Sequence, residues 1–392
     1  MLEFTEEQRL IRNEVRNICS EFDDEYWRSH DRDAEYPMAF VRTLAEHGWL
    51  GTVIPEEYDG AGLDTLEAAI VLEEITASGA GFSGSMACHG AMFIPRSIIN
   101  YGTEEMKERL LPELARGESL LQCFSLTEPN AGFDTTAITT AAEKRGDEYV
   151  ISGQKVWTSR FHASDYMVLV ARTTPLAEVE KKTDGLSLFL VDIADAKAQG
   201  TVQAEKIEKN IRAAVPSYEV WFEELAVPAE NLIGTEDDGF AQVMDGLNEE
   251  RVVIAAEAVG LARAAIDRAV AYATDREVFD RPIGANQAIQ HPLADAYARM
   301  VGARNITYQA ARAFKDGRDV GEAANVAAYL AREAASEATD AAVQTHGGYG
   351  VATEFDVERF YREARLTRIA PISDEMILNY LGEHVLGLPR SY

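Results

Sequence analysis

The sequence predicts an α+β protein whose consecutive parts are a helical domain, a β-domain and a helical bundle. Three observations carry this prediction. Apolar residues recur three and four apart before residue 121, short β-branched and aromatic runs follow to about 235, and long alanine-rich stretches come after it. A chain of 392 residues is too long for one ordinary core. We therefore expect domains at 1–120, 121–235 and 236–392.

The first 120 residues read mostly as helices. Thr5 to Gln8 has the pattern of a capping box and opens an amphipathic stretch. The apolar face of that stretch is expected to consist of Leu10, Ile11, Val15 and Ile18. Further helices are expected from Val41 to just before Gly48, from Thr65 to Thr76, and from Thr103 to near Pro112.

The middle part reads as an antiparallel β-domain. Runs beginning at Tyr149, Tyr166, Leu186 and Tyr218 alternate in polarity or are apolar throughout, and turn residues separate them. Helices are then expected at 240–273, 289–314, 321–345 and 373–386. Helices that are long and apolar on one face favour an antiparallel four-helix bundle.

Composition narrows the classes of function. The net charge of −29 argues against nucleic acid as a partner, because nucleic-acid binding needs a basic face. The acidic surface fits either an ordinary soluble enzyme or adaptation to high salt, and both readings stay open. No apolar run is long enough for a membrane span, and the N-terminus lacks the pattern of a secretory signal, so we expect a cytoplasmic protein. Cys19, Cys88 and Cys123 are expected to be free thiols, and no metal site is expected.

Four motifs stand in order along the chain. They are Cys123-Phe-Ser-Leu-Thr-Glu-Pro-Asn-Ala-Gly132, Gly153-Gln-Lys-Val-Trp-Thr-Ser159, Asp275-Arg-Glu-Val-Phe-Asp-Arg-Pro-Ile-Gly-Ala-Asn-Gln287 and Gln344-Thr-His-Gly-Gly-Tyr-Gly350. A turn, a strand aromatic, a surface loop or a helix cap could explain each of them alone. Together with the domain order, the four resemble the acyl-CoA dehydrogenase family over essentially the whole chain.

The resemblance implies FAD as the cofactor and assigns residues to it. Phe124, Leu126 and Thr127 would contact the flavin ring, Trp157, Thr158 and Ser159 would lie beside it, and Ser373 and Glu375 match flavin-adjacent positions in a late loop. A second group would reach the FAD of a neighbouring subunit: Arg276, Phe279, Gln287, Gln344, Gly347 and Gly348. A homo-oligomer follows, a tetramer as in the family.

The catalytic base is assigned to Glu250 by resemblance. Many family members place this glutamate in the late loop, where the present chain has Pro371. The isovaleryl-type and long-chain-type enzymes instead carry it on a long helix, just before an arginine, and Glu250 with Arg251 matches that pattern. Glu249 is the rival, about 100° round the helix. Asn248 and Arg251 would contact the pantetheine arm of an acyl-CoA substrate.

The expected activity is α,β-dehydrogenation of a fatty or branched acyl-CoA, as in β-oxidation, with an electron-transfer flavoprotein as acceptor. Phe133 and Asp280 depart from the family pattern, where serine and glycine are usual. Two alternatives stay open: a flavin oxidase or monooxygenase of the same fold, and a non-catalytic FAD-binding partner protein. Residues 86–99 and 240–247 are expected to line the acyl pocket, but the acyl group itself is not predicted.

Overall fold

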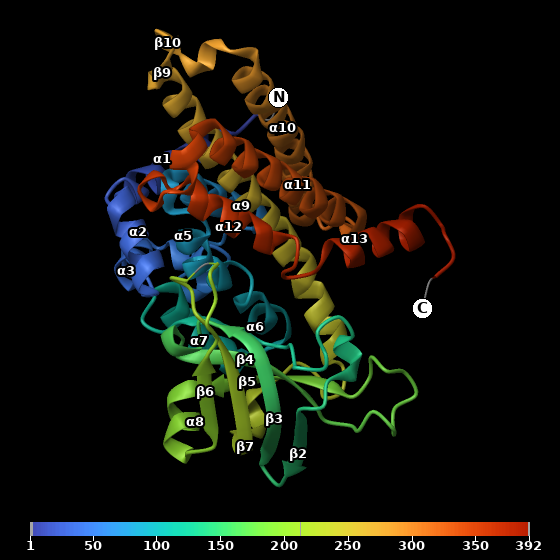
Figure 1. Cartoon of the computed structure of the whole chain (residues 1–392). Coiled ribbons are helices and arrows are strands. Elements are labelled where there is room, and N and C mark those ends of the chain that lie inside the picture. The colour runs from blue at the N-terminus through green and yellow to red at the C-terminus, as the bar shows by residue number, and fades with distance from the viewer. Residues whose placement is uncertain (1–2, 212, 391–392) are drawn as a thin grey trace.

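The computed structural model describes residues 3–211 and 213–390 and shows the expected succession of helical, β and helical parts. The β-domain lies at one end of the molecule, and a hairpin at the tip of the C-terminal helices lies at the other (Figure 1). The helix α9 (Gly239–Asp275) runs between these two ends. No helix in the described residues is long and apolar enough to cross a membrane.

The N-terminal helices follow the sequence prediction with two corrections. The capping box of Thr5 and Gln8 opens α1 (Glu6–Cys19), but Leu10 is 64% exposed, so its assignment to the buried face was wrong. The buried face is formed by Ile11, Val15 and Ile18, and Leu10 lies about 100° away from it. Next come α2 (Asp24–Asp33), α3 (Met38–Glu46), α4 (Thr65–Ile75), α5 (Gly81–Cys88) and α6 (Pro95–Tyr101).

The second correction concerns α7 (Glu104–Ala115), which does not end near Pro112 but runs through it. Proline removes one backbone donor from a helix and usually breaks it. Here the last turn is held by burial, because Leu110, Leu111 and Leu114 all lie in the core between the helical and β parts.

The β-domain is one sheet with the strand order β6-β7-β3-β2-β4-β5-β8 and with β1 paired to β4. Most neighbours are antiparallel, as predicted, but β1 pairs with β4 in parallel and β2 meets β4 in parallel at Ala141. The chain reaches β4 from β1 only after the β2–β3 hairpin, and this crossover allows the parallel direction. The strands are β1 (Leu121–Ser125), β2 (Ala141–Arg145), β3 (Glu148–Ser159), β4 (Tyr166–Arg172), β5 (Leu186–Asp192), β6 (Val202–Lys206), β7 (Ser217–Pro228) and β8 (Leu232–Ile233), with α8 (Ile193–Gln199) after β5.

The C-terminal part consists of α9, α10 (Gln287–Lys315), α11 (Gly321–His346), α12 (Val357–Thr367) and α13 (Asp374–Tyr380). The short strands β9 (Glu277–Val278) and β10 (Arg281–Pro282) form the hairpin at the tip. A single hydrophobic cluster joins these helices to α4 of the N-terminal part, so the two helical parts share a core.

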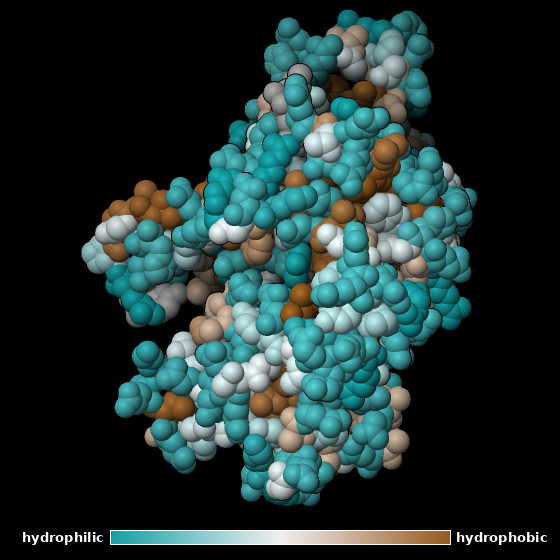
Figure 2. All heavy atoms as spheres, turned by 180° about the vertical axis from the view of Figure 1, so that it is seen from behind, coloured by the Kyte–Doolittle hydropathy of each residue, from teal (hydrophilic) through white to brown (hydrophobic). Residues whose placement is uncertain are grey.

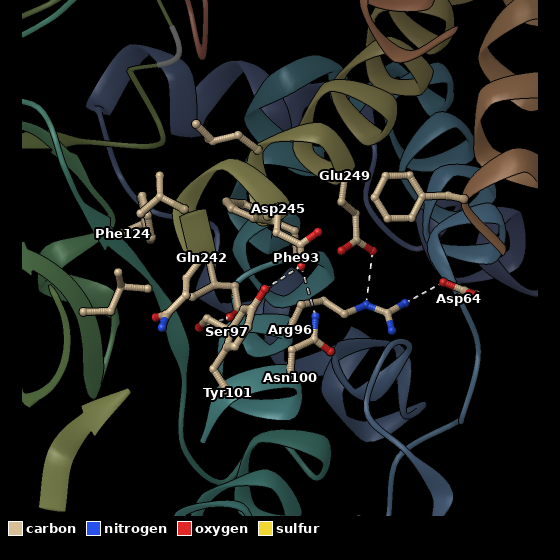
Figure 3. A pocket seen from close by; sticks show the side chains of 16 residues that line it. Asp64, Phe93, Arg96, Ser97, Asn100, Tyr101, Phe124, Gln242, Asp245 and Glu249 are labelled. Carbon is tan, nitrogen blue, oxygen red and sulfur yellow. Dashed lines mark hydrogen bonds and ion pairs between the residues drawn. The ribbon is translucent and has the colours of Figure 1, made fainter. Parts of the chain in front are cut away.

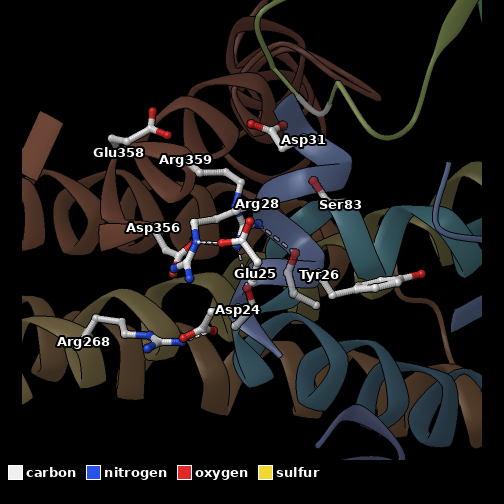
Figure 4. A network of polar contacts seen from close by, with 12 residues as sticks. Asp24, Glu25, Tyr26, Arg28, Asp31, Ser83, Arg268, Asp356, Glu358 and Arg359 are labelled. Carbon is white, nitrogen blue, oxygen red and sulfur yellow. Dashed lines mark hydrogen bonds and ion pairs between the residues drawn. The ribbon is translucent and has the colours of Figure 1, made fainter. Parts of the chain in front are cut away.

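Ion pairs tie α2 to the C-terminal helices. Arg28 Nη1 lies 2.9 Å from Asp356 Oδ2, and Arg268 of α9 pairs with Asp24 (Figure 4). Seen from behind, most of the surface is hydrophilic, and apolar atoms gather on the projecting C-terminal segment (Figure 2). Exposed Leu378, Leu386 and Leu388 belong to that segment.

Candidate active site

The first third of α9 carries two adjacent carboxylates that point to different neighbours. Glu249 and Glu250 lie about 100° apart around the helix axis. Glu249 is buried, with 3% of the residue exposed, whereas 13% of the Glu250 side chain is exposed. The helix is regular through this segment, and the neighbouring Arg251 is also buried.

Glu250 faces a buried histidine. Its Oε1 lies 3.4 Å from Nε2 of His89, in the turn after α5, and Nδ1 of His89 lies 3.2 Å from Oε1 of Glu257. Glu257 is fully buried two turns along α9, and its other carboxylate oxygen has no described partner. Burial alone would lower the pKa of His89, but the charge of Glu257 and the hydrogen bonds to both carboxylates raise it above its ordinary value.

Glu249 points to a different neighbour, Arg96 of α6. Oε1 of Glu249 accepts hydrogen bonds from Thr65 Oγ1 at 2.6 Å and from Arg96 Nε at 3.2 Å. The same guanidinium reaches Asp64 Oδ1 at 2.6 Å (Figure 3). Burial raises the pKa of Glu249, and the charge of Arg96 counteracts part of that rise.

A cavity of about 180 Å³ lies between α6, the start of α9 and the end of β1. It is lined by Phe93, Arg96 and Asn100 on one side and by Asp245, Leu247 and Glu249 on the other, with Phe124 at its β-domain edge (Figure 3). Glu250 is not among the lining residues. The cavity therefore lies where residues 86–99 and 240–247 meet.

The loop that follows β1 is held against β3 by the hydrogen bonds of a buried lysine. Lys155 is fully buried, and its Nζ donates to the Leu126 carbonyl and to Glu128, both at 2.9 Å. Glu128 in turn accepts bonds from Thr139 and Thr140, and the charge of Lys155 with these bonds outweighs burial and lowers its pKa to about 2. These bonds set Phe124, Leu126 and Thr127 in fixed positions beside the cavity.

Trp157 stands out on β3. The register of β3 against β7 shifts between Lys155 and Thr158, and Trp157 has a φ of 61°, in the left-handed region. The residue is nevertheless 56% exposed. Its neighbours turn inward: Thr158 bonds Ser125 and Ser159 bonds Ser217, each at 2.9 Å. Strained backbone that presents a large aromatic ring outward is typical of a binding position.

The late loop approaches α9 through a buried arginine. Arg332 of α11 donates to the Ile372 carbonyl at 2.8 Å and pairs with Asp374 at 3.4 Å. It also interacts electrostatically with Glu250 and Arg251. Ser373 caps α13, while Pro371 and Glu375 are exposed. The loop carries proline and not a carboxylate at position 371.

The remaining predicted residues lie at the tip, away from this cluster. Phe279 is 94% exposed with a φ of 55°, and Arg276 and Gln287 are also exposed. His346 stacks on Tyr272 with ring centroids 4.2 Å apart, which places the neighbouring segment 344–348 at the same end. From Glu250 to the end of α9 the axis runs about 38 Å. Within one chain, the structure does not bring the tip residues to Phe124 or Trp157.

Comparison with known proteins identifies the family of the chain. Sequence models described as the N-terminal, middle and C-terminal domains of acyl-CoA dehydrogenase match residues 5–118, 123–225 and 237–386. The chain belongs to the acyl-CoA dehydrogenase family. Members of this family are FAD-dependent oxidoreductases, and the chain is therefore a flavoenzyme.

Several relatives match over nearly the whole chain. An acyl-CoA dehydrogenase of Mycobacterium tuberculosis is 38% identical over 395 residues, which cover 99% of this chain and 98% of that protein. A glutaryl-CoA dehydrogenase of Desulfococcus multivorans is 35% identical and covers 92% of this chain and 91% of that protein. The structure of a glutaryl-CoA dehydrogenase with glutaryl-CoA has a TM-score of 0.91 at 32% identity, covering 100% of this chain and 98% of that one. Butyryl-CoA dehydrogenase from Megasphaera elsdenii gives 0.92 at 29% identity, covering 98% and 100%.

The residues of this acyl-CoA dehydrogenase fit a flavin. Trp157 offers an exposed ring, and buried donors of Arg332 (Nε and Nη2) and Arg251 (Nε) have no described protein partner. At the tip, a Cβ built on Gly347 or Gly348 would meet no atom within 4 Å, so bare backbone faces open space there. Unpaired donors and bare backbone are what a phosphate-bearing cofactor requires.

Sequence reasoning missed three residues of the site. His89 and Arg96 are separated from their partners on α9 by more than 150 residues, and Asp64 joins the site through Arg96. A lone histidine or arginine in a helical run has no motif around it, and only the fold brings it to Glu249 or Glu250. The sequence did mark the segment 86–99 as pocket-lining, which was the one available signal.

Proposed function

We propose that the protein oxidises an acyl-CoA to the trans-2-enoyl-CoA, with Glu250 removing the proton from Cα. The proposal rests on one observation: the two adjacent glutamates of α9 have different surroundings. Glu249 is committed to Thr65 and Arg96, whereas the Glu250 side chain stays 13% exposed, with its Oε1 3.4 Å from Nε2 of His89. A base must be both oriented and reachable, and Glu250 meets both conditions.

The chemistry needs two events at neighbouring carbons. When bound, FAD would supply the acceptor for the hydride from Cβ. Glu250 takes the weakly acidic Cα proton, and the partly desolvated surroundings of His89 and Arg251 hold the carboxylate in one place. Arg251 donates to Asn248 Oδ1 at 2.6 Å, so it orients Asn248 toward the pantetheine arm of the substrate. The wall that would hold the flavin consists of Phe124, Leu126, Thr127, Trp157 and Ser159.

The proposal is tested by anaerobic titration of the FAD-loaded protein with acyl-CoAs, comparing the parent with Glu250→Gln and Glu249→Gln. We expect flavin bleaching in the parent and a loss of at least about 1,000-fold in its rate in Glu250→Gln, because the amide cannot accept the proton. The flavin spectrum before substrate should be unchanged in this variant. Bleaching that survives in Glu250→Gln but is lost in Glu249→Gln would move the base to Glu249.

The electron acceptor and the assembly are also proposed. A structure described as the electron transferring flavoprotein of Acidaminococcus fermentans shares the fold, with a TM-score of 0.92 at 30% identity over 98% of this chain and 99% of that one. We propose that an electron-transfer flavoprotein reoxidises the present protein, so reduced flavin should react slowly with air. The exposed tip with Phe279 and Arg276 supports a homo-oligomer, a tetramer, in which each tip completes the FAD site of a neighbour.

A further inference from the structure

The cavity next to the segment that carries the proposed base has a mixed lining, in which apolar side chains such as Phe93, Phe124 and Leu247 alternate with polar and charged ones. Its lining includes Asp64, Arg96, Asp245 and Glu249 as charged residues, together with Ser97, Asn100, Tyr101 and Gln242. An alkyl chain gains nothing from such groups and would prevent water from solvating them. The lining therefore predicts a substrate whose acyl group carries a polar substituent.

Glu249 is the group that faces the cavity with bonding capacity left. Both of its described hydrogen bonds, from Thr65 and from Arg96, go to Oε1. No described bond uses Oε2, and the residue is 97% shielded from bulk solvent, at 3% exposure, while lining the cavity (Figure 3). Oε2 is not among the buried side-chain atoms that lack a partner, so it is open to the cavity, where a ligand can donate a hydrogen bond to it.

The charged residues that line the cavity determine which charge a ligand can carry there. Asp64 and Glu249 both contact Arg96, so the one cation of the lining is already matched by two carboxylates. Asp245 adds a third carboxylate at the mouth, where Tyr101 Oη donates to it at 3.0 Å. The cavity therefore repels anions, which excludes a carboxylate-bearing acyl group and the phosphates of coenzyme A from this space.

We propose that this cavity binds a short acyl group that carries a hydrogen-bond donor, a hydroxyl or an ammonium, directed at Glu249. The inference rests on the proposed dehydrogenation and specifies its substrate class. A volume of about 180 Å³ is close to that of cavities that hold a benzene-sized molecule, so about six carbon atoms is the expected size. The proposal separates this chain from its glutaryl-CoA dehydrogenase relatives, whose substrate carries a carboxylate.

The test uses four acyl-CoAs of equal length: hexanoyl-, 6-hydroxyhexanoyl-, 6-aminohexanoyl- and adipoyl-CoA. Each is titrated into the FAD-loaded parent anaerobically, and binding of the matching 2-enoyl product is measured by calorimetry. Glu249→Gln and Asp245→Asn are compared with Glu105→Gln, which removes one charge from the exposed face of α7.

We expect the hydroxy or the amino compound to bind at least tenfold more tightly than hexanoyl-CoA, and adipoyl-CoA to bind most weakly. In Glu249→Gln the preference for the amino compound should disappear, in Asp245→Asn it should weaken, and in Glu105→Gln it should persist. Hexanoyl- or adipoyl-CoA bound best, or a preference unchanged in Glu249→Gln, overturns the inference. If no acyl-CoA bleaches the flavin, the dehydrogenase proposal fails, and the product-binding series still decides what the cavity holds.

Discussion

His89 has more influence on the site than any other single residue outside the predicted motifs. It is buried between Glu250 and Glu257, and its pKa is raised above the ordinary value because the two carboxylates outweigh the effect of burial. Since the folded state favours the imidazolium, this contribution to stability is fully present below the ordinary histidine pKa. It is lost as the pH rises through the raised value.

The corresponding prediction concerns the pH dependence of flavin reduction. His89→Gln removes a group beside Glu250 whose pKa is raised, so the change in rate that accompanies deprotonation of His89 should be absent from the profile of the variant. The maximal rate should fall less than in Glu250→Gln. Stopped-flow reduction between pH 5 and 9 measures both. His47→Gln, at an exposed position in the turn after α3, serves as the control. A profile identical to that of the parent would show that His89 only fills space.

Individual residues show which features could be predicted from the sequence and which could not. Local chemistry was readable: the capping box at Thr5 was confirmed, because both partners lie within one helical turn. Burial decided the cases that failed, namely Leu10, which faces solvent, and Pro112, which a buried last turn tolerates. Contacts across more than 100 residues, such as His89 with Glu250, have no local signal and depend on the assembled fold.

At the scale of elements, α4 is the most unusual helix, because every one of its residues is buried although three of them are glutamates. Glu74 is matched by Arg12, Arg16 and Arg263, and Glu73 by Arg263, Arg304 and Tyr308. Glu67 is matched by Lys315. The acidic face of α4 therefore links α1, α9 and α10, and it explains why the two helical parts share one core.

Glu74→Gln is predicted to lower the free energy of unfolding by about 3 kcal/mol, because it removes the charge partner of Arg12 and Arg16 and leaves Arg263 with Glu73 alone. Burial would raise the pKa of Glu74, but Arg263 and the other arginines lower it to about 2. A carboxyl group with a lowered pKa stabilises the folded state above its unfolded value near 4.5. It loses this effect as the pH falls toward 2.

Urea denaturation followed by circular dichroism at pH 7 and pH 3 checks this prediction. The gap between parent and Glu74→Gln should be large at pH 7 and narrower at pH 3. The matched control is Glu14→Gln on the exposed side of α1, which should behave like the parent at both pH values. An equal gap at both pH values would mean that packing, not charge, accounts for the loss.

At the scale of the whole molecule, the net charge of −29 coexists with arginines that are mostly engaged by carboxylates. Some of these pairs are buried, such as Arg359 with Glu363, and others are exposed, such as Arg32 with Asp33, while the face seen in Figure 2 is mostly hydrophilic. This arrangement is compatible with both readings of the charge, ordinary solubility and adaptation to salt.

The length of α9 sets the last constraint. Phe124 and Trp157 belong to the β-domain and Glu250 to the first third of α9, whereas Phe279 and Arg276 lie at the hairpin tip, about 38 Å further along the helix from Glu250. If both groups serve flavin, as proposed, one FAD must lie between two chains. The exposed phenyl ring of Phe279, on left-handed backbone at the tip, is then expected to contact a partner subunit.

Phe279→Ser is therefore predicted to weaken self-association and FAD retention together, while each chain stays folded. Light scattering gives the mass, the ratio of flavin to protein absorbance gives the FAD content, and circular dichroism reports folding. Leu10→Ser removes a similarly exposed apolar side chain from α1 and should leave mass and FAD content unchanged. A variant that keeps its mass but loses FAD would confine the role of Phe279 to the cofactor. One that keeps both would refute the shared site, because no other large apolar residue at the hairpin is as exposed among the described residues.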